Sequence, residues 1–244
     1  GPFLVRLFDK IAAEYPSKSN HLLRYIRRVF NWGLPRGYCT NNPAKGIEQA
    51  KERKRRRLPA HDVQNTMIEY ARAHHADYLW VVLELAYLCL LRGIEVLTLT
   101  DANEVAKGIE TNRRKGSNDS LIKWSPRLSA AVLAARQRRA RIWKAKGIPY
   151  PMKPEARPLL VNAKGKPITR GALDTIWGNM MRDAIKAGVI TPEQRFGSHD
   201  LKRRGITDTK GGKAGKLAAG GHKNESMLTV YDLEIPEVTT PGGV

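Results

Sequence analysis

The residue types that phosphate chemistry needs are grouped in the carboxyl-terminal half of the chain. His199 begins a run in which residues 199, 202 and 203 would share one face of a helix, presenting an imidazole and the cations of Lys202 and Arg203. His222 follows two glycines, and Tyr231 lies nine residues further on. Together, an imidazole, cations and a phenol can stabilise an anion, move a proton and attack as a nucleophile.

Two more cations stand where the local chain would fix their positions. Arg92 directly follows the most apolar run, residues 79–91, and Glu95 lies three residues later, where a continuing helix would bring its carboxylate to the guanidinium. Lys115 lies at the tip of a predicted hairpin, where a mobile ammonium can protonate a leaving oxygen. Each of these residues alone is as well explained by packing or solvation, so only the set supports a functional hypothesis.

The charge balance favours a polyanionic partner. The 244 residues include 43 Lys+Arg and 23 Asp+Glu, a formal net charge of +20. Such an excess suits nucleic acid, because each neutralised phosphate releases counterions. A solubilising basic surface would explain the charge equally well, and charge alone says nothing about chemistry. Residues 51–57, Lys-Glu-Arg-Lys-Arg-Arg-Arg, repel one another and are interpreted as a strap along a phosphate backbone.

Several other classes of protein are disfavoured. Cys39 and Cys89 are far apart in the sequence, which indicates reduced thiols and neither a disulfide framework nor a zinc site. No ligand cluster for a catalytic metal is visible, and no cofactor is expected. The apolar run at 79–91 is too short to span a bilayer and contains Glu84, and no signal peptide is visible.

Hydrophobic spacing predicts a mainly helical fold with a small β-sheet, of the α+β class. Two extended runs, at 106–114 and 120–124, flank a turn rich in Gly, Ser, Asn and Asp and predict a hairpin. Short helices and an extended tail at 233–240 are expected after residue 187. The predicted helices cover residues 3–15, 20–32, 62–74, 78–91, 125–146 and 170–187, and a short strand is predicted at 158–161.

The order of these motifs resembles the tyrosine recombinases, the phage-type integrases, over most of the chain. The resemblance implies a partial helical core-binding domain at residues 1–50, a basic linker at 51–58, and a catalytic domain with a carboxyl-terminal tail at 59–244. The residues that carry it are Arg92-x-x-Glu95, Lys115-Gly116 before Ser125-Pro126, His199-Asp200-Leu201, and Gly221-His222 followed by Tyr231.

The resemblance implies a site-specific recombinase that cleaves and rejoins DNA through a 3′-phosphotyrosine at Tyr231. Arg92 and Lys202 would clamp the nonbridging phosphate oxygens, and His222 would add a hydrogen bond. His199 would act as acid or base near the tyrosine, whereas Lys115 would protonate the leaving 5′ oxygen. This requires no metal.

Lys202 is a departure from the family pattern, which has arginine as its second cation. Lysine keeps the charge but loses the two-pronged fork that matches two phosphate oxygens. Either Lys202 serves, or Arg203 or Arg204 replaces it, or activity is reduced.

The implied partner is double-stranded DNA at attachment sites, bound by a homo-tetramer in the cytoplasm of a bacterial host. Two alternatives remain open. One is a catalytically weak or inactive DNA-binding protein with the same fold, which the change at Lys202 supports, and the other is an enzyme like the type IB topoisomerases. The residues predicted to contact DNA are Arg53, Lys54, Arg55, Arg113, Arg114, Arg203 and Arg204.

Overall fold

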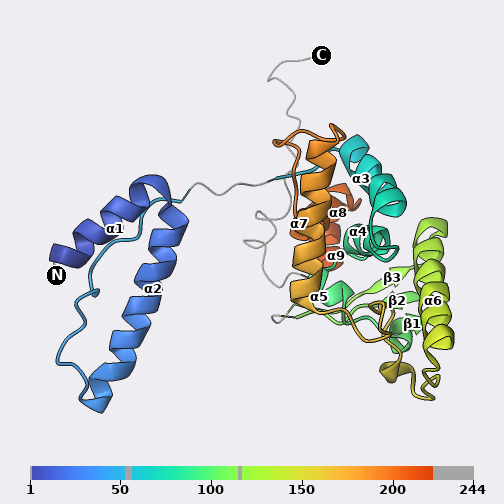
Figure 1. The fold of residues 1–244 in the computed structure, drawn as a ribbon, viewed down its shortest axis with the longest axis horizontal. Helices are drawn as coiled ribbons and strands as arrows, with labels where there is room; N and C mark the ends of the chain where they lie inside the picture. The colour runs from blue at the N-terminus through green and yellow to red at the C-terminus, as the bar shows by residue number, and fades with distance from the viewer. Residues whose placement is uncertain (1, 53–56, 115–116, 222–244) are drawn as a thin grey trace. The chain divides into compact units, whose positions relative to one another are not determined.

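The computed structural model describes residues 2–52, 57–114 and 117–221 (Figure 1). The chain divides into two compact units, Gly1–Arg56 and Arg57–Val244, and each is described by itself. The division falls within the predicted basic linker, whose residues 53–56 lie outside the described residues. The assignment of the two units as core-binding and catalytic domains stays a prediction.

The first unit contains two helices, α1 (Pro2–Glu14) and α2 (Pro16–Gly33), followed by the short 3-10 helix η1 (Leu34–Arg36). Proline suits the first turn of α2, because the N–H that it lacks would have no partner within the helix. Phe8, Leu23 and Ala44 form a small core. The segment after η1 returns along α2, because the Asn20 side chain bonds the carbonyl oxygen of Ala50 at 2.8 Å.

The second unit is built around α4, an apolar helix packed between α3, α6 and α8 (Figure 1). Seven of its ten residues are buried, including Leu79, Leu83 and Leu85. Among the described residues of this unit, the elements are α3 (His61–His74), α4 (Leu79–Leu88), α5 (Gly93–Val96), η2 (Asp101–Asn103), β1 (Glu104–Val105), β2 (Gly108–Glu110), β3 (Leu121–Lys123), α6 (Pro126–Lys146), η3 (Pro154–Ala156), α7 (Arg170–Lys186), α8 (Ser198–Asp208) and α9 (Gly212–Gly220).

Helix ends follow the capping residues in the sequence. Ser125 caps α6, its hydroxyl accepting a hydrogen bond from the Leu128 N–H at 3.2 Å, and Gly147 ends the helix in the left-handed conformation. Thr169 caps α7 in the same way, accepting from the Ala172 N–H at 3.2 Å. The predictions of helices at 125–146 and 170–187 are confirmed.

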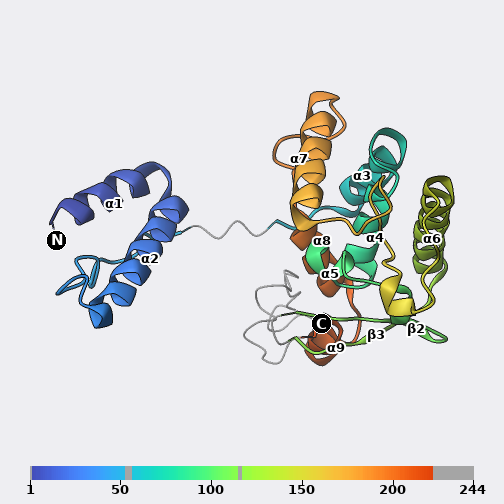
Figure 2. The ribbon, with the colours of Figure 1, turned by 60° about the horizontal axis from the view of Figure 1, so that its bottom comes forward.

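The sheet is antiparallel, in the order β1-β2-β3, and Figure 2 shows its strands beside α9. The predicted hairpin is confirmed, with Ile109 opposite Ile122, while the two-residue strand β1 was not predicted. The strand predicted at 158–161 is wrong. Only isolated bridges form there, Thr100 with Pro158 and Val161 with Pro167, because proline has no N–H to extend a ladder.

The apolar helix predicted at 78–91 ends earlier than expected. α4 stops at Leu88, and Leu90 takes a left-handed conformation with φ of 54°, which turns the chain before Arg92. A new short helix, α5, then starts at Gly93. Arg92 therefore precedes a helix and does not end one. The prediction of a mainly helical α+β fold is confirmed, and no described helix is long and apolar enough to cross a membrane.

Close packing of α8 on α4 depends on Gly205. A Cβ atom at this position would lie 2.4 Å from the Tyr87 carbonyl oxygen and 2.3 Å from Leu90 Cδ2. We predict that Gly205→Ala lowers the free energy of unfolding by about 1–3 kcal/mol, measured by urea denaturation, because the two helices must separate.

Gly178, inside α7, provides a matched control, since a Cβ atom added there would have nothing within 4 Å of it. Gly178→Ala should leave stability unchanged or raise it by up to about 1 kcal/mol, because alanine favours a helix. Equal effects of the two substitutions would contradict the proposed packing constraint.

Candidate active site

A buried carboxylate, Glu95, connects three separate segments of the second unit. Its Oε2 accepts a hydrogen bond from the Arg92 backbone N–H at 2.7 Å, and its Oε1 binds Arg92 Nη1 at 2.6 Å. Oε1 also accepts from the Arg114 backbone N–H in the hairpin at 3.1 Å. On the third segment, Lys202 Nζ of α8 lies 3.9 Å from Oε2.

The pKa of Glu95 reflects these contacts. Its side chain is fully buried, and burial alone would raise the pKa of the carboxyl group. Hydrogen bonds from Arg92 and Arg114 and the charge of Lys202 outweigh burial, and the pKa falls below its usual value. Glu95 is therefore a fixed negative charge around which cations are arranged.

Arg92 is held at the N-cap of α5 by Glu95. The carboxylate binds both its backbone N–H and its guanidinium, as a helix-capping acid does. The Arg92 side chain is 15% exposed, so the guanidinium is positioned but not sealed from solvent. A positioned, partly exposed arginine suits recognition of an anion such as a phosphate.

Lys202 is fully buried and comes from the face of α8 that meets Glu95. Burial lowers the pKa of its ammonium to about 7, with Arg113 and Arg92 adding to the decrease and Glu95 opposing it. Its ammonium is therefore partly deprotonated at neutral pH. Arginine would stay charged under the same conditions, because its guanidinium is not deprotonated in proteins.

His199 lies one helical turn before Lys202 on α8. Burial lowers the pKa of its imidazole to about 4, and the charges of Arg203 and Arg92 add to the effect. The ring is therefore neutral near pH 7 and retains a nitrogen that can accept a proton. Arg92, His199 and Lys202 are in this way brought together, although they are distant in the sequence.

Arg203 and Arg204 have other partners on their own helix. Arg203 Nη1 binds Asp200 Oδ1 at 2.6 Å, and Arg204 Nη2 binds Asp208 Oδ1 at 2.8 Å. Lys202 Nζ instead lies 3.9 Å from Glu95 Oε2. Of the three cations considered for the second clamp position, Lys202 is thus the one that reaches the Glu95 cluster.

Arg113 was predicted to contact DNA, but its side chain is buried. Only 7% of it is exposed, and its guanidinium binds the Ser120 hydroxyl and the Ala219 carbonyl oxygen. The strand explains this, because Ile109, Thr111 and Arg113 alternate onto the buried face of the hairpin. Arg113 therefore joins parts of the protein to one another, and the prediction that it contacts DNA is wrong. Arg114, on the opposite face, is exposed.

Several predicted site residues lie outside the described residues. They are Lys115, His222 and Tyr231 of the catalytic set, and Arg53, Lys54 and Arg55 of the linker. Their neighbours are described, however. Arg114 is fixed to Glu95 immediately before Lys115, and Gly221 is fixed to the hairpin immediately before His222.

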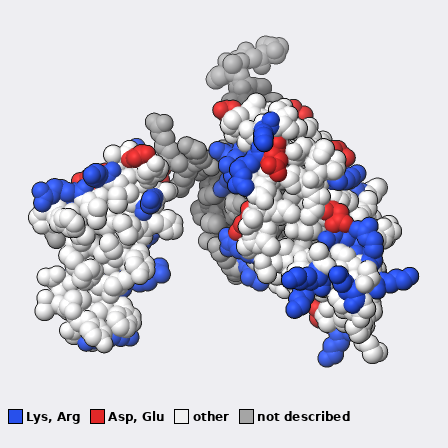
Figure 3. Space-filling model, in the orientation of Figure 1, with Lys and Arg blue, Asp and Glu red and all other residues white. Residues whose placement is uncertain are grey.

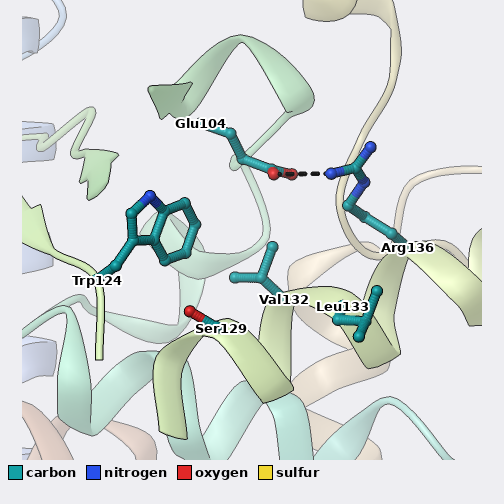
Figure 4. Close-up of a pocket in the computed structure, with 6 residues that line it drawn as sticks. All are labelled: Glu104, Trp124, Ser129, Val132, Leu133 and Arg136. Atoms are coloured by element: carbon teal, nitrogen blue, oxygen red, sulfur yellow. Dashed lines mark hydrogen bonds and ion pairs between the residues drawn. The ribbon is translucent and has the colours of Figure 1, made fainter. Parts of the chain in front are cut away.

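Two surface pockets of the second unit are lined by residues other than those of the Glu95 cluster. One, of about 240 Å³, is lined by Trp124 and residues of α6, and an ion pair of 3.1 Å between Glu104 and Arg136 borders it (Figure 4). The other, of about 690 Å³, is basic, with Arg204 and Lys216 in its lining. Neither pocket is lined by Arg92, His199 or Lys202.

Lysine and arginine are spread over the visible surface of the second unit and gather in its lower part in Figure 3. Acidic side chains on this face are fewer and scattered. A surface of this kind attracts a polyanion along its length, independently of the Glu95 cluster.

The sequence held a signal for the burial of Arg113 that was not used, but it held none for two of the contacts of Glu95. Period-two alternation from Ile109 would have assigned Arg113 to the buried face of the hairpin. For Glu95, spacing predicted the contact with Arg92, but its contacts with Arg114 and Lys202 depend on tertiary structure. No local pattern reports those contacts.

No protein-family model matches the chain, and no curated protein matches its sequence. Solved structures are similar in fold. A lambda integrase dimer bound to a COC′ core site aligns with a TM-score of 0.68 and 14% identity, covering 98% of this chain and 82% of that chain. The Tn1549 transposon integrase in complex with circular intermediate DNA gives 0.67 and 14%, over 95% and 80%.

A lambda integrase tetramer bound to a Holliday junction is also similar, with a TM-score of 0.66 and 15% identity over 97% of this chain and 66% of that chain. The chain therefore has the tyrosine recombinase fold, and the resemblance inferred from its motifs is confirmed at that level. At such low identity the likeness shows the fold alone.

The importance of Glu95 is testable by Glu95→Gln, which keeps the side chain's shape but removes its charge. We predict a loss of about 3–5 kcal/mol in the free energy of unfolding at pH 6, where Lys202 is charged, because two cations lose their buried counter-charge. Urea denaturation followed by circular dichroism measures it.

Glu84→Gln is the matched control. Glu84 is also nearly buried, but its partner Arg127 is 42% exposed and can turn into water when the carboxylate is lost. The loss should therefore be smaller than at Glu95. A loss at Glu84 equal to or larger than that at Glu95 would argue against the carboxylate's organising role.

Proposed function

We propose that this protein is a site-specific DNA recombinase of the integrase type, which cleaves and rejoins DNA through a 3′-phosphotyrosine at Tyr231. The observation that carries the proposal is the Glu95 cluster, in which Arg92 and Lys202 come from different segments to one buried carboxylate. Such a cluster is suited to a phosphodiester, an anion that resists attack unless its charge is balanced.

Two further observations support DNA as the substrate. The net charge of +20 favours a polyanion, and the similar solved structures include integrases bound to DNA. The exposed Arg114 and the basic stretch containing Arg53, Lys54 and Arg55 would contact the phosphate backbone, as would Arg203 and Arg204 if DNA displaces their carboxylate partners. Such contacts position a protein without reading sequence.

In the proposed reaction, Arg92 and Lys202 bind the nonbridging oxygens and balance the charge that develops in the transition state. Because Lys202 is fully buried, this contact requires the groups that cover its ammonium to move aside when DNA binds. The Tyr231 oxygen attacks phosphorus, and the bond to the 5′ oxygen breaks. His199, neutral near pH 7, accepts the phenol proton, and Lys115 donates a proton to the leaving oxygen. His222 adds a hydrogen bond to the phosphate.

The covalent intermediate explains how such an enzyme would rejoin DNA without an external energy source. The phosphotyrosine retains the energy of the broken bond, so a 5′-hydroxyl from another strand can reverse the step. We propose that the protein acts as a tetramer on two DNA sites. The lambda integrase tetramer bound to a Holliday junction has a similar chain fold.

A catalytically weak DNA-binding protein is the second candidate, and Lys202 favours it. A lysine with a pKa near 7 gives a weaker phosphate clamp than an arginine fork. This candidate predicts DNA binding without covalent capture, so the same experiment separates the two.

We predict that the wild-type protein forms a denaturant-resistant adduct with nicked suicide duplexes, because the short cleaved fragment diffuses away before rejoining. A duplex library randomised around the nick avoids the need to know the site in advance, and sequencing of captured DNA identifies it. Gel electrophoresis in detergent measures the adduct.

Tyr231→Phe is the control, because it removes only the hydroxyl group. The adduct should disappear while DNA binding, measured by fluorescence anisotropy, stays within about twofold. An adduct with Tyr231→Phe would assign the nucleophile elsewhere, and binding without any wild-type adduct would favour the non-catalytic candidate.

The pH dependence of cleavage should report Lys202. Its pKa of about 7 means that the charged clamp is present below pH 7 and is lost as the pH rises through that value. We therefore predict that kcat/KM, which reports the free protein, falls above about pH 7. Lys202→Arg should move this fall to higher pH, because a guanidinium stays charged.

The rate of single-turnover cleavage, measured from pH 6 to 9 with protein in excess, compares the wild type with Lys202→Arg. The other groups around Lys202 are Glu95, Arg92, Arg113 and His199. The pKa of the Glu95 carboxyl group lies below its usual value and that of the His199 imidazole is about 4, so neither of these two groups titrates near pH 7. Superimposable profiles for wild type and Lys202→Arg would show that another group controls the pH dependence.

A further inference from the structure

The β2–β3 hairpin is bonded directly to the end of α9, about a hundred residues later in the chain. Arg113 Nη2 donates to the Ala219 carbonyl oxygen at 2.7 Å, and the Asn118 N–H donates to the Gly221 carbonyl oxygen at 2.9 Å. Figure 2 shows α9 beside the strands of this hairpin. We call this pair of contacts the hairpin latch.

Arg113 also holds the two arms of the hairpin together. Its Nη2 donates to the Ser120 hydroxyl at 2.9 Å, its Nε to the Thr111 hydroxyl at 3.3 Å, and its backbone N–H to Asp119 Oδ1 at 2.6 Å. One side chain therefore joins both arms to the last turn of α9. Because Arg113 is 7% exposed, these bonds are shielded from competing water.

Gly221 completes the hairpin latch from the opposite side. Its φ of 67° is the left-handed conformation that ends α9, and a Cβ atom there would lie 2.4 Å from the Asn118 carbonyl oxygen and 2.9 Å from Arg113 Cδ. Any other residue would force the hairpin and α9 apart. Two different residues, Arg113 and Gly221, thus depend on the same close contact.

The hairpin latch lies next to two of the proposed functional residues in the sequence. Lys115 follows Arg113 by two positions, and His222 directly follows Gly221. The hairpin is fixed a second time where the Arg114 N–H binds Glu95. The chain just before Lys115 is therefore held at both Arg113 and Arg114.

A purely structural arginine is the alternative, and the same unit contains one. Arg139 is 1% exposed, and its guanidinium binds Asp101 and the carbonyl oxygens of Arg157 and Pro158. None of these partners adjoins a proposed catalytic residue. Arg139 is therefore a matched control for the burial of a bonded arginine.

We propose that Arg113 is a positioning residue for the proposed cleavage reaction: the hairpin latch fixes the hairpin to α9 so that Lys115 can give its proton to the leaving 5′ oxygen. This inference rests on the proposed function. In the step concerned, the Tyr231 oxygen forms the new bond to phosphorus, the bond to the 5′ oxygen breaks, and that oxygen takes the proton from the Lys115 ammonium. The phenol proton goes to His199.

The leaving group itself provides the test. Two duplexes of one sequence are compared, one with the normal 5′ oxygen and one with sulfur at that bridging position, because a thiolate leaves without needing a proton. We expect Arg113→Gln and Arg113→Lys to slow single-turnover cleavage of the oxygen duplex by at least about tenfold, within the range of lost acid catalysis. Cleavage of the sulfur duplex should stay within about threefold of wild type.

Gly221→Ala disrupts the hairpin latch at its α9 end and should show the same selective loss of cleavage on the oxygen duplex. This variant keeps the test decisive if the Arg113 variants are too unstable to assay. Arg139→Gln, with folding checked by thermal denaturation, should show no selective loss, because its contacts do not adjoin the proposed acid. Equal losses on the two duplexes for Arg113 and Gly221 variants would overturn the positioning role.

Lys115→Ala separates this inference from the function on which it rests. If sulfur rescues Lys115→Ala but not the Arg113 and Gly221 variants, the acid assignment stands and the hairpin latch does not position it. If sulfur fails to rescue Lys115→Ala, the acid role of Lys115 is wrong and the inference falls with it. Absence of cleavage of either duplex by wild type would reject the proposed function itself.

Discussion

The carboxylate of Glu95 is the interaction on which the rest of the site depends. Its two oxygens bind the Arg92 backbone, the Arg92 guanidinium and the Arg114 backbone, and Lys202 lies beside them. A buried negative charge of this kind is costly alone, yet it makes the burial of nearby cations tolerable. The site therefore stores positive charge before any substrate arrives. An anion that binds there meets groups already in place, so little reorganisation is needed.

The sequence predicted the fold class because its helices and hairpin carry local signals. Ser125-Pro126 and Thr169 mark helix starts by their own hydrogen bonds, and such chemistry is readable without tertiary structure. The break before Arg92 was not predictable in the same way. It depends on a left-handed Leu90, and burial among other elements compensates the strain of that conformation. Apolar periodicity continues through the break and conceals it.

For the candidate site, spacing placed His199 and Lys202 on one face of α8, and the structure orients that face toward Glu95. What spacing could not give was which of three neighbouring cations reaches the cluster. Arg203 and Arg204 are bound to Asp200 and Asp208 within α8, at spacings of three and four residues, whereas the contact of Lys202 with Glu95 depends on how α8 packs against the rest of the unit. Chain charge likewise suggested that Arg113 contacts DNA, whereas hairpin alternation buries it. Composition reports total charge, but only packing decides which charges remain at the surface.

The proposed function requires a covalent bond between DNA and one tyrosine, and mass spectrometry of the trapped complex can identify that bond. Trypsin cleaves after Lys223 and would release a peptide that starts at Asn224, and Tyr231 is the single tyrosine in residues 224–244. After nuclease digestion, we expect this peptide to carry a nucleotide joined through its 3′ phosphate to Tyr231. A nucleotide on another residue, or an unmodified peptide from a complex that survives denaturation, would contradict it.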